Sequence, residues 1–247
     1  MHSNMRVWGI TDTGLVRHEN QDAYQVLNAA EYTVAVVCDG MGGTRGGQVA
    51  SSIGVKVFSE EMEKALRKGM AADQIQQAMT YSASLANDAI RREADSNPEI
   101  RHMGTTLVAA IAWDDLAVVC NIGDSRAYRI SRDGISQITK DHSLVEDLVE
   151  HGELTPHEAR RHPNRNLITR ALGPDAVAQP DGFTVPWKKG EFILLCSDGL
   201  VNTVTDQEIL FEIIHSDMLD SCLDRLMTVA KGRGAPDNVT AVLLMNI

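Results

Sequence analysis

Two apolar runs in this chain end in the same way, with an aspartate followed by glycine. Residues 34–38 (VAVVC) lead into Asp39, and residues 192–196 (FILLC) lead through one serine into Asp198. Continuous apolar runs of this length are typical of buried strands, and a glycine at a strand end lets the backbone approach a bound group closely. The pattern predicts that both strands deliver a carboxylate to one shared site.

The other strands are predicted from shorter apolar or alternating runs. Residues 6–11 form the first, and a polar loop at 12–22 follows it, so that a hairpin with residues 34–38 is the simplest connection. Short turns are expected to join the next four strands into an antiparallel meander. These four and the later strands are expected at residues 105–113, 116–122, 126–130, 135–139, 183–185, 192–196 and 238–247.

Helices are predicted where apolar residues recur every three to four positions. Two long amphipathic helices are expected at about residues 48–68 and 72–94. Thr205, with a glutamate three residues later, marks the start of a capped helix, and another helix is expected at 218–231. Strands that come in groups, with paired helices between the groups, favour an α+β fold over alternating βαβ units.

Residues 140–173 follow neither pattern, because they are polar and interrupted by prolines. Two short helices are expected there. One begins at Thr155, Pro156 and Glu158, which supply an N-cap, a first-turn proline and a capping-box partner. We interpret the segment as an irregular excursion over the surface, and such excursions often carry function.

Length and charge narrow the class of protein. The 247 residues can bury a substantial core, and we expect one domain over residues 1–247. The net charge of −11 disfavours binding to nucleic acid or to an anionic membrane surface. No stretch approaches the ~20 apolar residues of a membrane span, and the start lacks a signal peptide, so we expect a cytoplasmic location.

The cysteines and histidines show no metal-binding pattern. The four cysteines lack the CxxC spacing, and three lie in apolar strand-like runs, where a reduced thiol packs as a small apolar group. Disulfides and zinc sites are therefore disfavoured. The eight histidines show no paired ligand spacing, and we interpret them as surface or helix residues.

Five aspartates lie at strand ends or in turns beside glycine, proline or asparagine: Asp22, Asp39, Asp124, Asp198 and Asp237. If they converge, two charges about 4 Å apart cost roughly 1 kcal/mol in water and about 4 kcal/mol at an effective dielectric of 20. Cations between them remove this repulsion, and carboxylates with backbone carbonyls and water suit Mg²⁺ or Mn²⁺ better than zinc. Two such ions can activate a water for attack on a phosphoryl group.

Arg17 adds a planar group of donors that suits phosphoryl oxygens. Taken singly, each of these residues has an ordinary structural explanation, because Asp-Gly after an apolar run is a common turn and a lone arginine is usually a surface charge. A domain that uses metals only for stability, however, would not explain why Arg17 accompanies the carboxylates.

Eight motifs occur in an order that resembles the PP2C-type, metal-dependent serine/threonine protein phosphatases, in particular their bacterial branch. The match extends over nearly the whole chain. The motifs are RHENQD (17–22), CDGMGG (38–43), MGTT (103–106), NIGDSR (121–126), DHSL (141–144), NLITRALG (166–173), CSDGL (196–200) and PDNVT (236–240). The resemblance implies a central sandwich of two antiparallel β-sheets flanked by pairs of α-helices, with a flap at about 140–173 beside a metal-binding cleft.

The resemblance also implies a role for each matched residue. Asp39 corresponds to the carboxylate that bridges two metals, Gly40 lends its backbone carbonyl, and Arg17 binds phosphate. Asp198 and Asp237 hold one metal.

Two further positions complete the metal residues that the resemblance implies. Asp22 acts near the other metal, through water, and Asp124 with Asp198 resembles a third-metal site. The implied cofactors are therefore two Mn²⁺ or Mg²⁺ ions in the core site, with a third at Asp124 and Asp198.

The sequence departs from the resemblance at two places. Many relatives have a histidine just after the Asp-Gly pair or a few residues later, where this chain has Met41, Thr44 and Arg45. Gln21 stands where a glutamate is frequent. Neither change affects a matched metal residue, and the general acid is left unassigned.

The implied activity is hydrolysis of phosphoserine and phosphothreonine in proteins by attack of metal-bound water, with a bacterial Ser/Thr kinase as the natural counterpart. Two alternatives stay open. A cysteine-phosphatase mechanism could use Cys38 or Cys196, although nearby acidic residues disfavour a thiolate. A pseudophosphatase could bind phosphorylated partners without turnover, which the missing histidine would explain.

The flap carries a group of arginines at positions 160, 161, 165 and 170 in an otherwise acidic protein. These side chains could attract the acidic surroundings of a phosphorylation site. They could equally form a helix surface that nearby glutamates balance.

Overall fold

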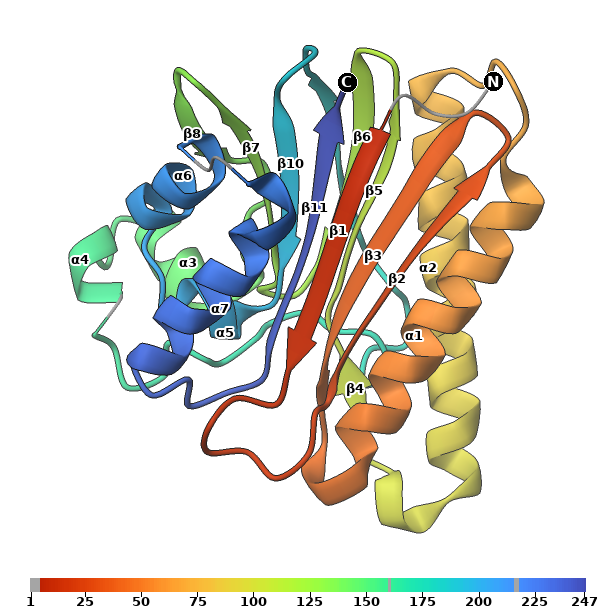
Figure 1. Ribbon diagram of the computed structural model, residues 1–247. Helices are drawn as coiled ribbons and strands as arrows, with labels where there is room; N and C mark the ends of the chain where they lie inside the picture. The colour runs from red at the N-terminus through yellow and green to blue at the C-terminus, as the bar shows by residue number, and fades with distance from the viewer. Residues whose placement is uncertain (1–4, 160, 216–217) are drawn as a thin grey trace.

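Two antiparallel β-sheets packed face to face form the centre of the molecule (Figure 1). The computed structural model describes residues 5–159, 161–215 and 218–247. In order across the first sheet, the strands are β1 (Met5–Asp12), β11 (Val239–Asn246), β10 (Phe192–Cys196), β7 (Arg126–Ser131) and β8 (Gly134–Gln137). Across the second sheet they are β2 (Asp22–Ala29), β3 (Tyr32–Met41), β5 (Leu107–Trp113), β6 (Leu116–Ile122) and β9 (Asp181–Pro186), and β4 (Gly104–Thr105) pairs with the end of β3.

The central strands are apolar on both faces, which explains their continuous apolar sequences. In β3, Ala35 and Val37 pack between the two sheets, whereas Val34, Val36 and Cys38 pack in the core beneath the helices. All five side chains are fully buried. Because alternate residues of a strand point to opposite faces, a strand that is covered on both sides must be apolar throughout.

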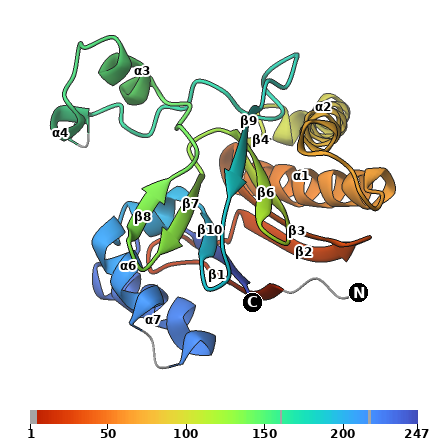
Figure 2. The ribbon, with the colours of Figure 1, turned by 90° about the horizontal axis from the view of Figure 1, so that it is seen from above.

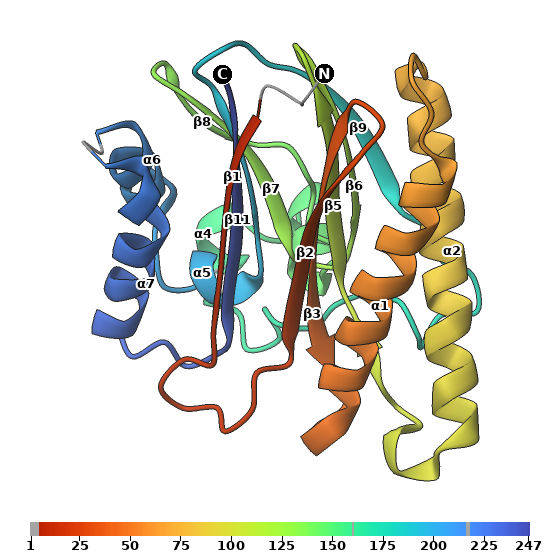
Figure 3. The same ribbon diagram turned by 45° about the vertical axis from the view of Figure 1, so that its right-hand side comes forward.

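A pair of helices covers the outer face of each sheet (Figure 3). The pairs are α1 (Gly43–Ala65) with α2 (Ala72–Ser96), and α6 (Asp206–Ile214) with α7 (Cys222–Gly232). The shorter helical pieces are η1 (Pro98–Ile100), α5 (Asp198–Val201) and η2 (Leu219–Ser221). The predicted α+β sandwich with flanking helix pairs is confirmed.

The expected hairpin between residues 6–11 and 34–38 is wrong. β1 pairs with β11 near the end of the chain, whereas β3 pairs with β2 in the other sheet. The strand β2 has the sequence DAYQVLNA and lies at the edge of its sheet, and most of its side chains are only half-buried. An edge strand of this kind lacks the apolar run that marks a central strand.

The predicted meander is also wrong at its centre. β5 and β6 lie in one sheet, but β7 and β8 lie in the other, so the chain crosses between the sheets at residues 123–125. Gly123 adopts a φ of 100°, where any residue with a side chain would be strained. The crossing places Asp124 at the end of both sheets instead of in the turn of a hairpin.

Residues 140–173 form the expected flap, which contains two short helices, α3 (Leu144–Glu150) and α4 (Pro156–Ala159). The predicted cap of α4 is present, since the Thr155 N–H donates to Glu158 Oε2 at 2.8 Å. An isolated β-bridge between Ser143 and Ile168 ties the two ends of the flap together. Figure 2 shows α3 and α4 standing away from the sandwich.

None of the helices in the described part of the chain is both long and apolar enough to cross a membrane. The single-domain organisation and the cytoplasmic location stay predictions from the sequence.

Candidate active site

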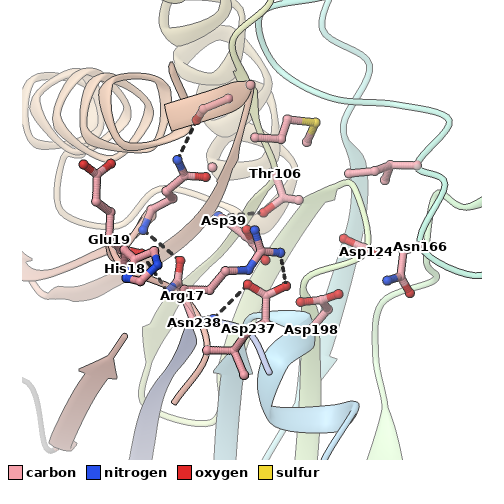
Figure 4. A pocket seen from close by; sticks show the side chains of 17 residues that line it. Arg17, His18, Glu19, Asp39, Thr106, Asp124, Asn166, Asp198, Asp237 and Asn238 are labelled. Atoms are coloured by element: carbon pink, nitrogen blue, oxygen red, sulfur yellow. Dashed lines mark hydrogen bonds and ion pairs between the residues drawn. The ribbon is translucent and has the colours of Figure 1, made fainter. Parts of the chain in front are cut away.

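A cavity of about 560 Å³ opens at the end of the sandwich where α1 begins (Figure 4). Six of the seven predicted site residues line it: Arg17, Asp39, Gly40, Asp124, Asp198 and Asp237. Asp22 is the exception and lies beneath the cavity, in the β2–β3 pairing directly opposite Asp39. The structure therefore brings the predicted residues together, although the sequence separates them by up to 220 positions.

Each carboxylate at the cavity comes from a different part of the chain. Asp39 lies near the end of β3, and Asp198 is the first residue of α5, directly after β10. Asp237 precedes β11, and Asp124 lies in the crossing from β6 to β7. Since β3 belongs to one sheet and both β10 and β11 to the other, the site exists only where the two sheets meet.

Two threonines fix the backbone of Asp39. Its N–H donates to Thr106 Oγ1 at 2.9 Å, and its carbonyl accepts from Thr105 Oγ1 at 2.8 Å and from the Thr106 N–H at 2.9 Å. These bonds orient the Asp39 side chain without using its carboxylate. Both threonines belong to the Met-Gly-Thr-Thr motif, but the sequence pattern does not show that they form hydrogen bonds with the backbone of Asp39.

Gly40 is required by a close approach of two backbone segments. A Cβ at this position would lie 2.0 Å from the Gly47 carbonyl oxygen and 2.6 Å from that of Gln21. Real contacts never come so close, so a side chain would push α1 away from the end of β3. The glycine keeps the start of α1 beside the carboxylates.

Asp22 is buried below the cavity, where its carboxylate accepts a hydrogen bond. Its Oδ2 accepts from Ser197 Oγ at 2.8 Å, and the same Ser197 oxygen accepts from the Thr240 N–H at 3.0 Å. Ser197 precedes Asp198, so this chain of bonds links β2 in one sheet to β10 and β11 in the other.

Burial raises the pKa values of four acidic side chains of the site. Burial, followed by the charges of neighbouring aspartates, raises the pKa of Asp39 well above its usual value and also raises the pKa of Asp198. The same causes raise the pKa of Asp124 to about 7 and that of Asp22 to about 6. Such shifts arise when like charges share a water-poor site without a counter-ion.

These carboxyl groups fit a divalent cation. The buried Oδ1 atoms of Asp22 and Asp198 have no hydrogen-bond partner, and an unpaired buried oxygen is costly. A cation would satisfy such oxygens and neutralise the repulsion between the carboxylates. Within the described residues, no three His, Cys, Asp or Glu side chains are placed to hold one ion alone. A cation in the cavity would therefore draw these carboxylates closer together and take backbone carbonyls and water as further ligands, as Mg²⁺ and Mn²⁺ allow.

Arg17 lies at the mouth of the cavity in the loop between β1 and β2. Its Nη2 donates to Asp237 Oδ2 at 2.8 Å, and 53% of its side chain remains exposed (Figure 4). Asn238 anchors this loop, because its Nδ2 donates to the carbonyls of Thr13 and Glu19. The anchored loop presents a guanidinium group beside the acidic cluster.

Sequence spacing assigns the histidines to surfaces and helices, and this is wrong for His142. Its side chain is buried, with Nδ1 accepting from the Gly123 N–H at 3.2 Å and Nε2 lying 3.1 Å from Asp181 Oδ2. His142 thereby ties the start of the flap to the residue that precedes Asp124. His18 lines the cavity. Neither position was recognisable from spacing, because the contacts involve other parts of the chain.

The two departures from the expected motifs have structural consequences. Gln21 Nε2 donates to the Gly43 carbonyl at 2.8 Å, a bond that a glutamate carboxylate could not make. Met41 lines the cavity and has no proton to give to a leaving group.

Burial contradicts the cysteine-phosphatase alternative. Cys38 and Cys196 are fully buried. Burial raises the pKa of the Cys196 thiol to about 12 and raises that of Cys38 far above its ordinary value. Since the thiolate is the reactive form, neither residue can serve as a nucleophile at neutral pH. The four cysteines are buried free thiols.

The arginines of the flap do not form one free basic surface. Arg170 Nη1 pairs with Asp181 Oδ1 at 3.1 Å. Arg161 and Arg165 are exposed, and Arg160 lies outside the described residues. The expectation of an acidic-peptide surface therefore rests on Arg161 and Arg165, and because neither lines the cavity, it concerns substrate residues further from the phosphorylated one.

Two antiparallel sheets with an acidic cavity and an arginine at their shared end are the arrangement expected of a metal-dependent phosphatase. The chain belongs to the protein phosphatase 2C family, whose model matches residues 16–243.

Individual relatives agree with this assignment. The chain is 37% identical over 246 residues to the serine/threonine phosphatase stp of Listeria innocua, covering 99% of this chain and 95% of that protein. It resembles the solved S. agalactiae serine/threonine phosphatase with a TM-score of 0.92, 31% identity and coverage of 98% and 100%. A PstP catalytic domain in complex with two manganese ions matches with a TM-score of 0.83, 32% identity and coverage of 98% and 97%.

Proposed function

We propose that this protein removes phosphate from phosphoserine and phosphothreonine in other proteins, with Mn²⁺ or Mg²⁺ held in the acidic cavity. The observation that carries the proposal is the convergence of four aspartates and Arg17 on one cavity. A carboxylate cluster alone would suit a structural cation, but a guanidinium beside it suits a phosphoryl anion between the two. We take residues 1–247 as a single catalytic domain.

The proposed core site holds two ions. Asp39 would serve both ions, with the backbone carbonyl of Gly40 beside it. Asp198 and Asp237 would help to hold one ion, and Asp22 would act near the other through water. The unpartnered Oδ1 atoms of Asp22 and Asp198 support this assignment.

A third ion is proposed at Asp124 and Asp198. Burial and the charge of Asp198 raise the pKa of Asp124, which is the behaviour of two carboxylates that share a site without a counter-ion. Asp124 sits in the crossing between the sheets, close to the flap, so an ion here would also stabilise the start of the flap.

When bound, the ions acidify a water nucleophile and neutralise the charge that develops on the phosphoryl group. The chain's own residues position the reactants. Arg17 holds the phosphoryl oxygens with parallel N–H donors, which fixes the phosphorus relative to the carboxylates. Thr105 and Thr106 keep Asp39 in place through its backbone, so that its carboxylate is free to bind a cation.

The proposed substrates are phosphoproteins, and the natural counterpart is a Ser/Thr kinase that phosphorylates them. A pseudophosphatase that binds phosphorylated partners without turnover has no support in the site. All four aspartates and Arg17 are present at the cavity, and Met41 is the one departure that removes a proton donor there.

Phosphate release from a phosphothreonine peptide, measured with Mn²⁺ and with a chelator, tests the proposal. The wild type should show turnover that depends on the metal, and Asp39→Asn and Asp198→Asn should lose it. A folded, Mn²⁺-loaded wild type that binds the peptide but releases no phosphate would instead identify a phosphoprotein-binding protein.

A further inference from the structure

Two exposed aliphatic side chains, Leu15 and Val16, lie directly before Arg17 in the loop between β1 and β2. They are 61% and 62% exposed; Val16 lines the cavity, and Leu15 is its neighbour in the loop. Single exposed aliphatic residues are common on protein surfaces. Two adjacent ones beside a proposed phosphate-binding arginine place apolar surface where a substrate chain must pass.

The backbone that carries them is held in place. The Leu15 N–H donates to the Ala235 carbonyl at 2.9 Å, and the Gly14 N–H donates to Asp12 Oδ1 at 2.9 Å. Gly14 has a φ of 79°, and a Cβ there would lie 2.2 Å from the Asp237 carbonyl oxygen. The loop thus lies against the turn that carries a proposed metal residue, and its exposed side chains occupy a defined position.

The flap contributes aliphatic surface to the same cavity. Ile168 lines the cavity together with Val16, and the bridge between Ser143 and Ile168 fixes it at the base of the flap. Leu167, the preceding residue, is 49% exposed. Two distant chain segments therefore both present aliphatic side chains at the entrance to an otherwise acidic site.

We propose that Leu15 and Val16, with Ile168 from the flap, form an aliphatic rim that binds an aliphatic side chain adjacent to the phosphorylated residue of the substrate. The inference rests on the proposed phosphatase function and specifies the class of phosphoprotein that the site prefers. Successive residues of an extended chain lie about 3.3–3.6 Å apart, so the neighbour of a phosphothreonine that reaches Arg17 comes to the mouth of the cavity.

Charge favours an aliphatic neighbour over an acidic one at this position. Glu19 lines the cavity on the same loop as Val16, and the protein carries a net charge of −11. A carboxylate next to the phosphorylated residue would lie near Glu19 and would lose hydration on an aliphatic surface, whereas leucine, isoleucine or valine would bury apolar surface on the rim.

Three phosphothreonine peptides that carry leucine, glycine or glutamate on both sides of the phosphorylated residue test the rim. With the Mn²⁺-loaded wild type, kcat/KM for the leucine peptide should exceed that for the glycine peptide by about tenfold, mainly through KM, because the contact lies away from the phosphoryl group. The glutamate peptide should be the poorest substrate. In the double variant Leu15→Ser/Val16→Ser, the leucine-to-glycine ratio should fall to within about twofold.

Val177→Ser is the matched control, because Val177 is also an exposed valine, at 66%, and does not line the cavity. It should keep the wild-type ratio. The single variant Val16→Ser should show an intermediate ratio, and circular dichroism establishes that each variant is folded. The rim proposal is overturned if the double variant loses activity equally on the leucine and glycine peptides, or if the wild type shows no preference between them. A wild type that releases phosphate from none of the peptides overturns the phosphatase proposal itself.

Discussion

Arg17 Nη2 lies 2.8 Å from Asp237 Oδ2, so the proposed phosphate-binding group directly contacts a proposed metal residue. The two side chains are 53% and 34% exposed, and ion pairs this accessible contribute only about 0–1 kcal/mol to stability. The pair therefore matters for the position of the guanidinium. A phosphoryl group bound by Arg17 would be held next to a carboxylate that is proposed to bind the cation.

Replacement of Arg17 by alanine should separate function from stability. We expect kcat/KM for a phosphopeptide to fall by about 10²-fold, because charge-assisted hydrogen bonds to the phosphoryl group are lost. The melting temperature should change by less than about 4 °C. Arg6→Ala is the control, since Arg6 pairs with Asp220 at the same distance of 2.8 Å, both side chains are well exposed at 48% and 75%, and neither residue lines the cavity. Equal losses of activity in both variants would contradict the role of Arg17.

Asp39→Asn should affect the metal-free and metal-loaded proteins in opposite ways. Burial and the neighbouring aspartates raise the pKa of Asp39 well above its usual value, so a neutral amide in its place should raise the melting temperature measured in a chelator. The same change should weaken Mn²⁺ binding and remove the stabilisation that Mn²⁺ gives the wild type. Thermal melts with chelator and with Mn²⁺ measure both effects.

An exposed aspartate on a helix provides the control for this comparison. Asp95 lies near the end of α2, and Asp95→Asn should leave both melting temperatures within about 1 °C of wild type. If Asp39→Asn destabilised the metal-free protein, or bound Mn²⁺ as tightly as wild type, the proposed bridging position would be wrong.

The sequence predicted the parts of the site that local pattern controls. Asp39 and Asp198 follow apolar strands, so their position at a strand end could be inferred from residues beside them. The crossing between the sheets at Asp124 could not be inferred in this way, because a Gly-Asp-Ser sequence is equally compatible with the turn of a hairpin. The partner of β1 was also missed, since β11 lies more than 200 residues away and pairing is not encoded in either strand alone.

Buried polar contacts were the other part that the sequence could not supply. Ser197 and Asp22 are 175 residues apart and hydrogen bonded in the core. Such a pair depends on how two sheets pack, and neither residue has a distinctive neighbourhood in sequence. The motif order identified which residues belong to the site, but their contacts required the structure.

Ser197→Ala should destabilise the protein through two unsatisfied groups. The hydroxyl donates to Asp22 Oδ2 and accepts from the Thr240 N–H, and its loss leaves both buried groups without that partner. We expect the free energy of unfolding, measured with urea, to fall by about 2–4 kcal/mol. Ser59→Ala is the matched control, because Ser59 is equally buried but its hydroxyl has no hydrogen-bond partner. It should be neutral or slightly stabilising, and a comparable loss in both variants would count against the bridging role of Ser197.

The stability of the metal-free protein should fall as the pH rises from 5 to 8. The pKa values of Asp22 and Asp124 are raised from 3.8 to about 6 and about 7, so the folded state holds more protons than the unfolded state in this window. Stability decreases with pH wherever the folded state binds the additional protons. Carboxyl groups with lowered pKa values, such as Asp12 and Asp181, act in the opposite direction, but their effect is complete below pH 5.

Urea unfolding in a chelator at several pH values measures this dependence, and Asp124→Asn tests its source. The variant should show a shallower decrease, because one of the carboxyl groups with a raised pKa is gone and the charge it placed near Asp198 is absent. Saturating Mn²⁺ should reduce the decrease for the wild type, since a bound cation favours the ionised carboxylates and its affinity rises as they lose their protons. A metal-free wild type that gains stability between pH 5 and 8 would mean that these carboxyl groups ionise freely in the folded protein, and the repulsion that supports the proposed cation site would then be absent.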